Sequence, residues 1–252
     1  MTSDHPTDAA PLVLPVSRRR GFWSLVRDIL VIVAIAIVVS LVIKTFLVRS
    51  FYIPSGSMEQ TLLVKDRILV DELTPRFTGY ERGDVVVFRD PGGWLPVSAA
   101  PADQSALVRA GDWLLSLVGI TASDSDEHLI KRLIGLPGDH VVCCNAIGQI
   151  TVNGTPIDET PYLDLAPGQS APEVVPFDVT VPDGSLWVLG DNRDHSRDSR
   201  YNIDQPSHGF VPIDNVVGRA FLITWPLNRF GTIDGHHEVF SGVPAAAPAA
   251  GR

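Results

Sequence analysis

The chain has 252 residues, of which 45% are hydrophobic, and its formal net charge is −9. This length and apolar content suffice for one substantial core or two small subdomains, which excludes disorder throughout the chain. Residues 1–49 hold six Lys/Arg against three Asp/Glu, so the remainder holds 14 against 26 and has a net charge of −12. An acidic remainder argues against nucleic acid as a partner, because phosphate binding depends on Lys and Arg.

The N-terminal segment combines a polar beginning, a basic cluster and an apolar run. Residues 1–16 are polar and Pro-rich, and an arginine triplet follows at 18–20, which predicts a disordered basic tail over residues 1–24. The fifteen residues from Ile29 to Ile43 carry no charge, fewer than the roughly 20 that span a bilayer, but Lys44 can extend its ammonium to the interface. We therefore predict a single transmembrane anchor helix over residues 25–48, with a cytoplasmic N-terminus and everything after the anchor outside.

A cleavable signal peptide would have the same basic flank and apolar run. The sequence after the run lacks an obvious small-X-small cleavage site and continues directly into a serine-rich hexapeptide. For this reason we favour an anchor that is not cleaved.

The hexapeptide at 53–58, Ile-Pro-Ser-Gly-Ser-Met, places two hydroxyl groups around one glycine. Pro54 fixes its own φ, and Gly56 permits a tight turn with no side chain beside Ser57. Such a turn exposes a serine nucleophile, although a Ser/Gly loop that only redirects the chain explains the same residues.

Two neighbouring cations lie inside the apolar run Leu129–Leu136, which a Pro-Gly-Asp turn closes. Strand alternation places Lys131 and Arg132 on opposite faces. If Lys131 points inward, desolvation lowers its pKa from about 10.4 toward a range in which the neutral amine accepts a proton from serine. The alternative is an edge strand with its charges in water.

A third stretch, Gly190–Arg200, is dense in hydrogen-bonding groups and follows the apolar segment Leu186–Leu189. Three motifs follow the apolar run along the chain. They are, in order, Ser-Gly-Ser-Met, Lys-Arg-X-X-Gly-X-Pro-Gly-Asp and Gly-Asp-Asn-Arg-Asp-X-Ser-X-Asp-Ser-Arg. In this combination the chain resembles the type I signal peptidases, membrane-bound serine proteases with a Ser/Lys dyad, from about Arg49 to Ile233. The resemblance implies removal of signal peptides from exported preproteins after Ala-X-Ala sites.

The resemblance also implies the catalytic roles. Ser57 is the expected nucleophile and Lys131 the expected general base. The backbone N–H of Ser57 and the hydroxyl of Ser55 are expected to form the oxyanion hole. The expected partners are signal peptides and the lipid bilayer, and no cofactor or metal is expected.

Further positions match the family's supporting and substrate-binding residues. Ser196 is expected to hydrogen-bond Lys131, and Asp198 is expected to pair with Arg200 or Arg132. The expected supporting residues are Ser196, Asp198, Arg200, Arg132 and Asp191. The expected lining of the shallow substrate pockets is Phe51, Ile53, Pro54, Met58, Leu62 and Ile130.

The chain departs from the family's pattern at three places. Glu59-Gln60 stands where a proline usually follows the serine motif, which adds an acid near the pocket rim, and Leu129 replaces an aromatic residue of some members. His195 stands where the family often has Asn. Its spacing from three aspartates does not exclude a Ser-His-Asp triad, but we interpret His195 as non-catalytic.

Cys143 and Cys144 are the only cysteines in the chain. Neighbouring residues on a strand point to opposite faces, so a bridge between them would strain the backbone, and we predict two free thiols. Adjacent cysteines also lack the spacing of zinc ligands, and the seven histidines are scattered.

Short apolar runs separated by Gly and Pro turns predict a mainly β domain of antiparallel, coiled or barrel-like sheets behind the anchor helix. Asn153-Gly154 is a strong hairpin signal. The predicted strands include 61–63, 67–70, 83–89, 129–134, 141–144, 149–152, 186–189 and 216–226.

The predicted organisation has four parts. They are a cytoplasmic tail (1–24), an anchor (25–48), an extracytoplasmic peptidase domain (49–235) and a disordered C-terminal tail (236–252). Residues 90–128 form an insertion whose apolar piece at 113–118 is a small packed helix or a lip that touches the outer membrane leaflet.

Two other functions fit parts of the pattern. A self-cleaving regulator of the LexA type resembles this family in fold and dyad, but the anchor and the lack of a helix-turn-helix pattern count against it. A membrane-tethered, inactive peptide-binding module would keep the groove without the chemistry, and the joint presence of Ser57 and Lys131 counts against that.

Overall fold

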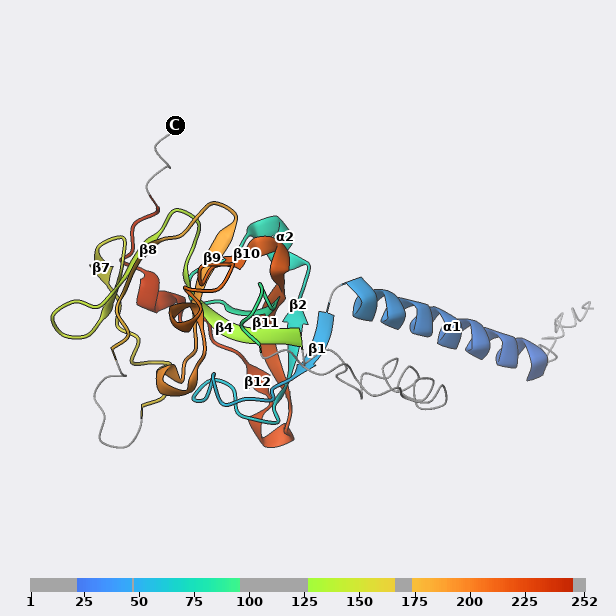
Figure 1. Cartoon of the computed structure of the whole chain (residues 1–252). Coiled ribbons are helices and arrows are strands. Elements are labelled where there is room, and N and C mark those ends of the chain that lie inside the picture. The colour runs from blue at the N-terminus through green and yellow to red at the C-terminus, as the bar shows by residue number, and fades with distance from the viewer. Residues whose placement is uncertain (1–21, 47, 96–126, 166–173, 247–252) are drawn as a thin grey trace, which may run out of the picture. The chain divides into compact units, whose positions relative to one another are not determined.

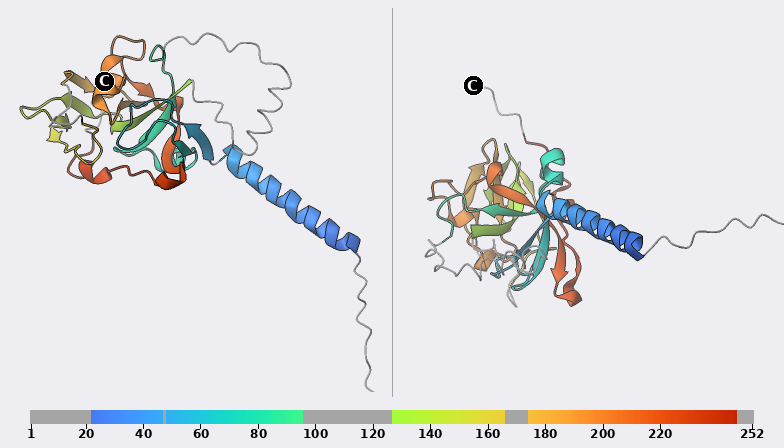
Figure 2. Two further views of the ribbon diagram at one scale, coloured as in Figure 1. Left: turned by 90° about the horizontal axis from the view of Figure 1, so that it is seen from below. Right: turned by 90° about the vertical axis from the view of Figure 1, so that its right-hand side faces the viewer.

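In a computed structural model, residues 22–46, 48–95, 127–165 and 174–246 are described. The chain divides into two compact units between Val42 and Ile43. Helix α1 (Phe22–Phe46) covers most of the predicted anchor and is one continuous helix (Figures 1 and 2). Within the described ranges, no helix combines the length and the apolar character that crossing a membrane requires.

The larger of two sheets has eight strands, and all its pairings are antiparallel. Its order is β1-β2-β11-β3-β4-β9-β10, with β12 added beside β11. The strands are β1 (Val48–Tyr52), β2 (Arg67–Asp71), β3 (Val85–Arg89), β4 (His128–Gly135), β9 (Ser185–Leu189), β10 (Val211–Pro212), β11 (Val216–Trp225) and β12 (Gly231–Thr232). In β3, four consecutive residues are buried, and a strand covered on both faces has such a continuous apolar run rather than alternation.

The smaller sheet has four antiparallel strands in the order β7-β6-β5-β8. They are β5 (His140–Cys143), β6 (Ile150–Val152), β7 (Thr155–Pro156) and β8 (Phe177–Thr180). Asn153 and Gly154 join β6 to β7 with φ angles of 51° and 78°, as a two-residue hairpin turn requires. The predicted hairpin is confirmed, and Figure 1 shows β7 and β8 at the opposite side of the β region from β1 and β2.

Short helices occupy the connections between strands. They are α2 (Thr74–Thr78) and the 3-10 helices η2 (Arg193–His195), η3 (Ser199–Tyr201), η4 (Ile213–Asn215), η5 (Leu227–Arg229) and η6 (His237–Phe240). Two of them, η2 and η3, lie in the third sequence motif. That motif therefore forms tight turns after β9 rather than a further strand.

Three groups of buried side chains form the core. One of them joins β1, β2 and β11 to the loop that carries the serine motif, through Phe51, Ile53, Met58 and Leu62. Burial of the last three of these side chains fixes the loop against the sheet. The second group lies under the smaller sheet, and the third lies around Phe88, Trp94 and Val188.

The mainly β, antiparallel fold is confirmed, but two details of the prediction are wrong. The larger sheet has two free ends in the described residues, β1 and β10, so it does not close on itself. Residues 61–63 are not a strand, because the Leu62 N–H donates to the Met58 carbonyl at 2.7 Å and closes a helix-like turn.

Near the C-terminus, the predicted tail includes residues that are packed. Phe240 in η6 is 6% exposed and joins the core group under the smaller sheet, so the ordered domain continues past 235. Residues 96–126, with the apolar piece at 113–118, and residues 247–252 lie outside the described residues. The other domain boundaries stay predictions.

The cysteine prediction is also wrong, because Cys143 and Cys144 form a disulfide. The prediction assumed that both residues belong to one strand. Strand β5 ends at Cys143, so strand alternation does not govern the direction of the Cys144 side chain.

Candidate active site

The first two motifs meet in one hydrogen bond. Lys131 Nζ donates to Ser57 Oγ at 2.8 Å and to the Ile130 carbonyl at 2.9 Å. Ser57 is 6% exposed and Lys131 is 4% exposed. A serine from the loop after β1 and a lysine from the middle of β4 thus form a buried pair.

Burial determines the charge state of Lys131. Its strand, β4, runs between β3 and β9, and Val86 of β3 is its cross-strand partner. Neither of its two hydrogen-bond acceptors is a carboxylate. Desolvation lowers the pKa of Lys131 from 10.5 to about 8, although the charges of Asp198 and Asp191 oppose this shift. A useful fraction of the amine is therefore neutral near neutral pH.

The loop around Ser57 leaves little room beside its glycine. A Cβ on Gly56 would lie 2.8 Å from the carboxylate carbon of Glu59. On the other side, the Asn192 N–H donates to the Ser57 carbonyl at 3.2 Å. Gly190 also packs closely here, since a Cβ on it would clash with the Ser57 carbonyl and with Ser196. The loop is thus held between its own turn and the third motif.

Ser55 lies beside the nucleophile. Its side chain is exposed, and its Oγ donates to Ser57 Oγ at 3.4 Å. Its role in an oxyanion hole stays a prediction.

Arg132, the neighbour of Lys131, is completely buried and fully paired. Its guanidinium binds both carboxylate oxygens of Asp191 at 2.8 Å and donates to Thr61 Oγ1 at 3.1 Å. It also donates to the Gly83 carbonyl at 2.8 Å and lies 4.3 Å from the ring centre of Tyr162. Arg132 thus links the serine loop, β4 and the third motif.

A second buried pair orders the third motif. The Asp198 carboxylate receives two bonds of 2.9 Å from the Arg200 guanidinium and one of 3.0 Å from the Gly190 N–H. Of the two expected partners of Asp198, Arg200 is the one that contacts it.

Ser196 does not make its predicted contact. It is buried, and its Oγ has no hydrogen-bond partner among the described residues. The Lys131 ammonium instead donates to Ser57 and Ile130. The expected hydrogen bond between Ser196 and Lys131 is therefore absent in this structure.

Sequence comparison identifies the family of the chain. A family model described as "Signal peptidase, peptidase S26" matches residues 26–225. The chain belongs to the signal peptidase family, peptidase S26. It is 41% identical over 226 residues to "Signal peptidase I" of Mycobacterium tuberculosis, covering 83% of this chain and 76% of the relative.

Two further relatives of this S26 family member extend the match. "Probable signal peptidase I" of Mycobacterium leprae is 36% identical over 254 residues, covering 92% of this chain and 86% of the relative. "Signal peptidase I" of Leptolyngbya laminosa is 34% identical over 232 residues, covering 92% of this chain and 95% of the relative. The similarity therefore includes nearly all of the described residues.

The predicted substrate-pocket residues separate into two groups. A shallow pocket of about 20 Å³ is lined by Phe51, Ile53, Pro54 and Ile130. Met58 and Leu62 are instead fully buried in the core group beneath the serine loop. The pocket also includes five residues that the motifs did not indicate as lining: Tyr52, Ile68, Val87, His128 and Leu129. Only the assembled sheet, in the order β1-β2-β11-β3-β4, brings these together.

The departures from the family pattern have local structural counterparts. Gln60 has a φ of 84°, whereas the ring of a proline holds φ near about −65°. The backbone at this position therefore could not accept a proline. Glu59 Oε2 receives a hydrogen bond of 3.2 Å from Asn192 Nδ2, which ties the serine loop to the third motif.

His195 is exposed and lies in the third motif. Its Nδ1 contacts Asn192 Oδ1 at 3.1 Å, and the hydrogen-bonding nitrogen at Ser57 belongs to Lys131 instead. The structure therefore places a lysine amine, and not an imidazole, at the Ser57 hydroxyl.

One group of side chains has the types and spacing of metal ligands. Asp234, His236 and Glu238 each place a ligand atom within 4.8 Å of the others, at the surface. Exposed acidic groups commonly lie this close without a metal. Among the residues that the structure describes, no hydrogen bond joins any of the three to Ser57 or Lys131.

Proposed function

We propose that this chain is a membrane-bound serine endopeptidase that removes N-terminal signal peptides from exported preproteins after small-X-small (Ala-X-Ala) sites. The observation that carries the proposal is the 2.8 Å hydrogen bond between buried Lys131 Nζ and Ser57 Oγ. The family of the chain and the names of its relatives support the substrate class.

The proposed mechanism uses the two residues in sequence. Neutral Lys131 accepts the proton of Ser57 as Oγ attacks the scissile carbonyl carbon and forms a C–O bond. The lysine then gives this proton to the leaving amine as the C–N bond breaks, which leaves an acyl-enzyme. Lys131 next takes a proton from water as the water attacks the ester, and it returns this proton to Ser57 Oγ as the ester C–O bond breaks and the carboxylic acid product leaves.

Charge on the tetrahedral intermediate needs donors beside Ser57. We assign this role to the backbone N–H of Ser57 and the hydroxyl of Ser55, whose Oγ is 3.4 Å from the nucleophile. A hydroxyl that donates to Ser57 in the free enzyme can rotate to the oxyanion when it forms. Losing one such donor typically lowers kcat by about 10²–10³.

Shallow pockets suit small substrate side chains. The pocket of about 20 Å³ beside the serine loop is lined by Ile53, Pro54 and Ile130, among others. An extended peptide presents alternate side chains to the same face. Two small residues separated by one arbitrary residue would therefore face this surface, as an Ala-X-Ala site requires.

The membrane location in this proposal rests on the sequence of residues 25–48. Ile29–Ile43 is uncharged and follows a basic cluster, and Lys44 would have to extend toward the interface for the run to span the bilayer. External protease applied to spheroplasts should digest residues 49–235. Protection of this domain together with cleavage of residues 1–20 would reverse the orientation.

The deciding experiment is preprotein cleavage by the full chain in detergent, with Ser57→Ala as the matched variant. We expect the wild type to release a mature protein whose new N-terminus follows an Ala-X-Ala site, and Ser57→Ala to release none. Cleavage of a separate preprotein distinguishes this function from self-cleavage of the LexA type. A folded wild-type protein that binds the preprotein without cutting it would instead indicate a peptide-binding module.

A further inference from the structure

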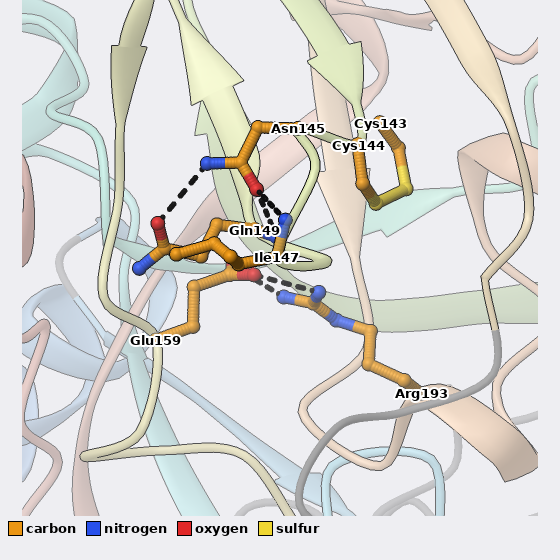
Figure 3. Close-up of a disulfide and its surroundings, with 7 residues drawn as sticks. All are labelled: Cys143, Cys144, Asn145, Ile147, Gln149, Glu159 and Arg193. Carbon is orange, nitrogen blue, oxygen red and sulfur yellow. Dashed lines mark hydrogen bonds and ion pairs between the residues drawn. A yellow bond between two sulfur atoms is a disulfide. The ribbon is translucent and has the colours of Figure 1, made fainter.

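A second cavity lies apart from the dyad, beside the smaller sheet. It has a volume of about 240 Å³, and neither Ser57 nor Lys131 lines it. Its wall includes the disulfide between Cys143 and Cys144, together with the buried side chains of Glu159 and Arg193 (Figure 3). The cavity thus combines a reducible bond with a buried ion pair.

The disulfide is accessible and is held beside an ordered turn. Both cysteines are partly exposed. Directly after them, Asn145 Oδ1 accepts hydrogen bonds from the Ile147 and Gln149 N–H groups at 3.1 and 2.9 Å. Ile147 and Gln149 also line the cavity. The position of both sulfurs and the form of this wall therefore depend on the same short segment.

The ion pair links the cavity to the third motif, which contacts the Ser57 carbonyl. Arg193 binds both carboxylate oxygens of Glu159, at 2.6 and 2.9 Å, and its Nε donates to the Gly190 carbonyl at 2.8 Å. Two residues after Gly190, the Asn192 N–H donates to the Ser57 carbonyl at 3.2 Å. The Arg193 side chain thus contacts both the cavity and the third motif, and the third motif contacts the Ser57 carbonyl through Asn192.

We propose that Cys143–Cys144 is a redox site for dithiol reductants, and that its oxidation state alters the cavity wall and, through Arg193, the peptidase activity. A thiolate of the reductant attacks one sulfur, the S–S bond breaks, and a mixed disulfide forms. The second thiol of the reductant then displaces the cysteine. The protein gains two electrons and two protons, and the reductant becomes a disulfide.

Reduction changes the wall because it releases a constraint. In the disulfide, both sulfurs are held together against the cavity. As free thiols, the two side chains adopt separate rotamers, and each can leave the wall independently. The part of the wall that Cys143 and Cys144 form then no longer has one fixed form.

Thiol counting tests the chemistry. Without reductant, an alkylating reagent should add to neither cysteine of the folded full chain, and after a dithiol reductant it should add to both, as mass spectrometry measures. The reduced protein should also bind phenylarsine oxide, a trivalent arsenical that bridges two close thiols. Alkylation of both cysteines without reductant would overturn the proposal.

Activity measurements test the link to the nucleophile, which rests on the proposed function. Reduction should lower kcat/KM on a preprotein by about two- to thirty-fold, the range expected of coupling through such a network, and reoxidation should restore it. The double variant Cys143→Ser/Cys144→Ser should match the reduced enzyme and ignore the reductant. An unchanged kcat/KM in enzyme that alkylation shows to be reduced would overturn the link.

The two failures are distinguishable. If neither redox state cleaves the preprotein, the proposed function fails, and thiol counting still decides whether the redox site exists. If the double variant does not fold, reduction and reoxidation of the wild type supply the same comparison.

Discussion

Lys131 and Arg132 are neighbours on one buried strand, yet their surroundings are opposite. Arg132 binds both oxygens of Asp191, a hydroxyl and backbone carbonyls, and it lies over an aromatic ring. Lys131 has only a serine hydroxyl and one carbonyl as hydrogen-bond acceptors, and burial lowers its pKa to about 8. The fold thus satisfies one cation completely and leaves its neighbour without a directly bonded carboxylate.

The difference follows from what each side chain can do. A guanidinium stays charged in proteins and binds a carboxylate with two parallel bonds, so arginine suits a permanent buried ion pair. An ammonium loses its proton when it is desolvated, so lysine suits a base. Arg132 maintains the arrangement of the three motifs, and Lys131 carries the charge change that the proposed reaction needs.

The largest expected effect comes from exchanging the two cations. Lys131→Arg keeps the charge but cannot release its proton, so cleavage of a preprotein should fall by about 10⁴ or more, as for loss of a catalytic residue. Circular dichroism should show whether the variant is folded. A folded Lys131→Arg enzyme that retains substantial cleavage would remove Lys131 from the role of base.

Removing the partner of Arg132 should mainly affect stability. Asp191→Ala leaves a buried guanidinium without its carboxylate, which typically costs about 3–5 kcal/mol in the free energy of unfolding. The matched control is Asp178→Ala, whose carboxylate is 72% exposed and contacts His140; an exposed pair contributes about 0–1 kcal/mol. Urea denaturation measures the free energy of unfolding of both variants. Equal losses in Asp191→Ala and Asp178→Ala would show that the Arg132 pair is not a structural support.

The cost of burying a lysine without a bonded carboxylate should appear as a stability gain in Lys131→Met. The pKa of Lys131 is 10.5 unperturbed and about 8 when folded. Between these values the unfolded chain binds more protons, so stability rises with pH, and the full cost of burial applies below pH 8. Lys131→Met should raise the free energy of unfolding at pH 7 by about 1–3 kcal/mol. Denaturation at pH 7 and again above pH 10.5 should show this gain shrinking.

The same pKa should shape the activity profile. Because the neutral amine is the base, kcat/KM should rise about tenfold per pH unit below the pKa of the free enzyme, with a midpoint near 8. A rate profile with several peptide concentrations at each pH measures this midpoint. A midpoint near about 6.5 would indicate a histidine instead.

The smallest effect is expected at His195. This side chain is exposed and contacts Asn192, so His195→Ala should change kcat/KM and stability little, within about 0.5 kcal/mol. Kinetics with the folded variant, beside Lys131→Arg, completes the comparison. Loss of cleavage in His195→Ala would make this a histidine-dependent hydrolase.

Local patterns in the sequence were sufficient for several elements. The apolar runs indicated antiparallel strands, and Asn153-Gly154 indicated a hairpin, because both depend on residues that are close along the chain. The three motifs in their order led to the family, and they selected Ser57 and Lys131, which the structure brings together at 2.8 Å. Composition and motif order carry such information without any knowledge of strand pairing.

Other features depend on residues that meet only in the folded chain. Nothing in the sequence pairs Arg132 with Asp191, 59 residues away, or places Tyr162 over the same guanidinium. The shallow pocket needs residues of β1, β2, β3 and β4, which meet only in the folded sheet, and the disulfide needs β5 to end between two cysteines. Sequence alone supplied the reacting groups and the local elements, whereas the pKa of Lys131 was decided by burial, which exists only once distant strands have packed together.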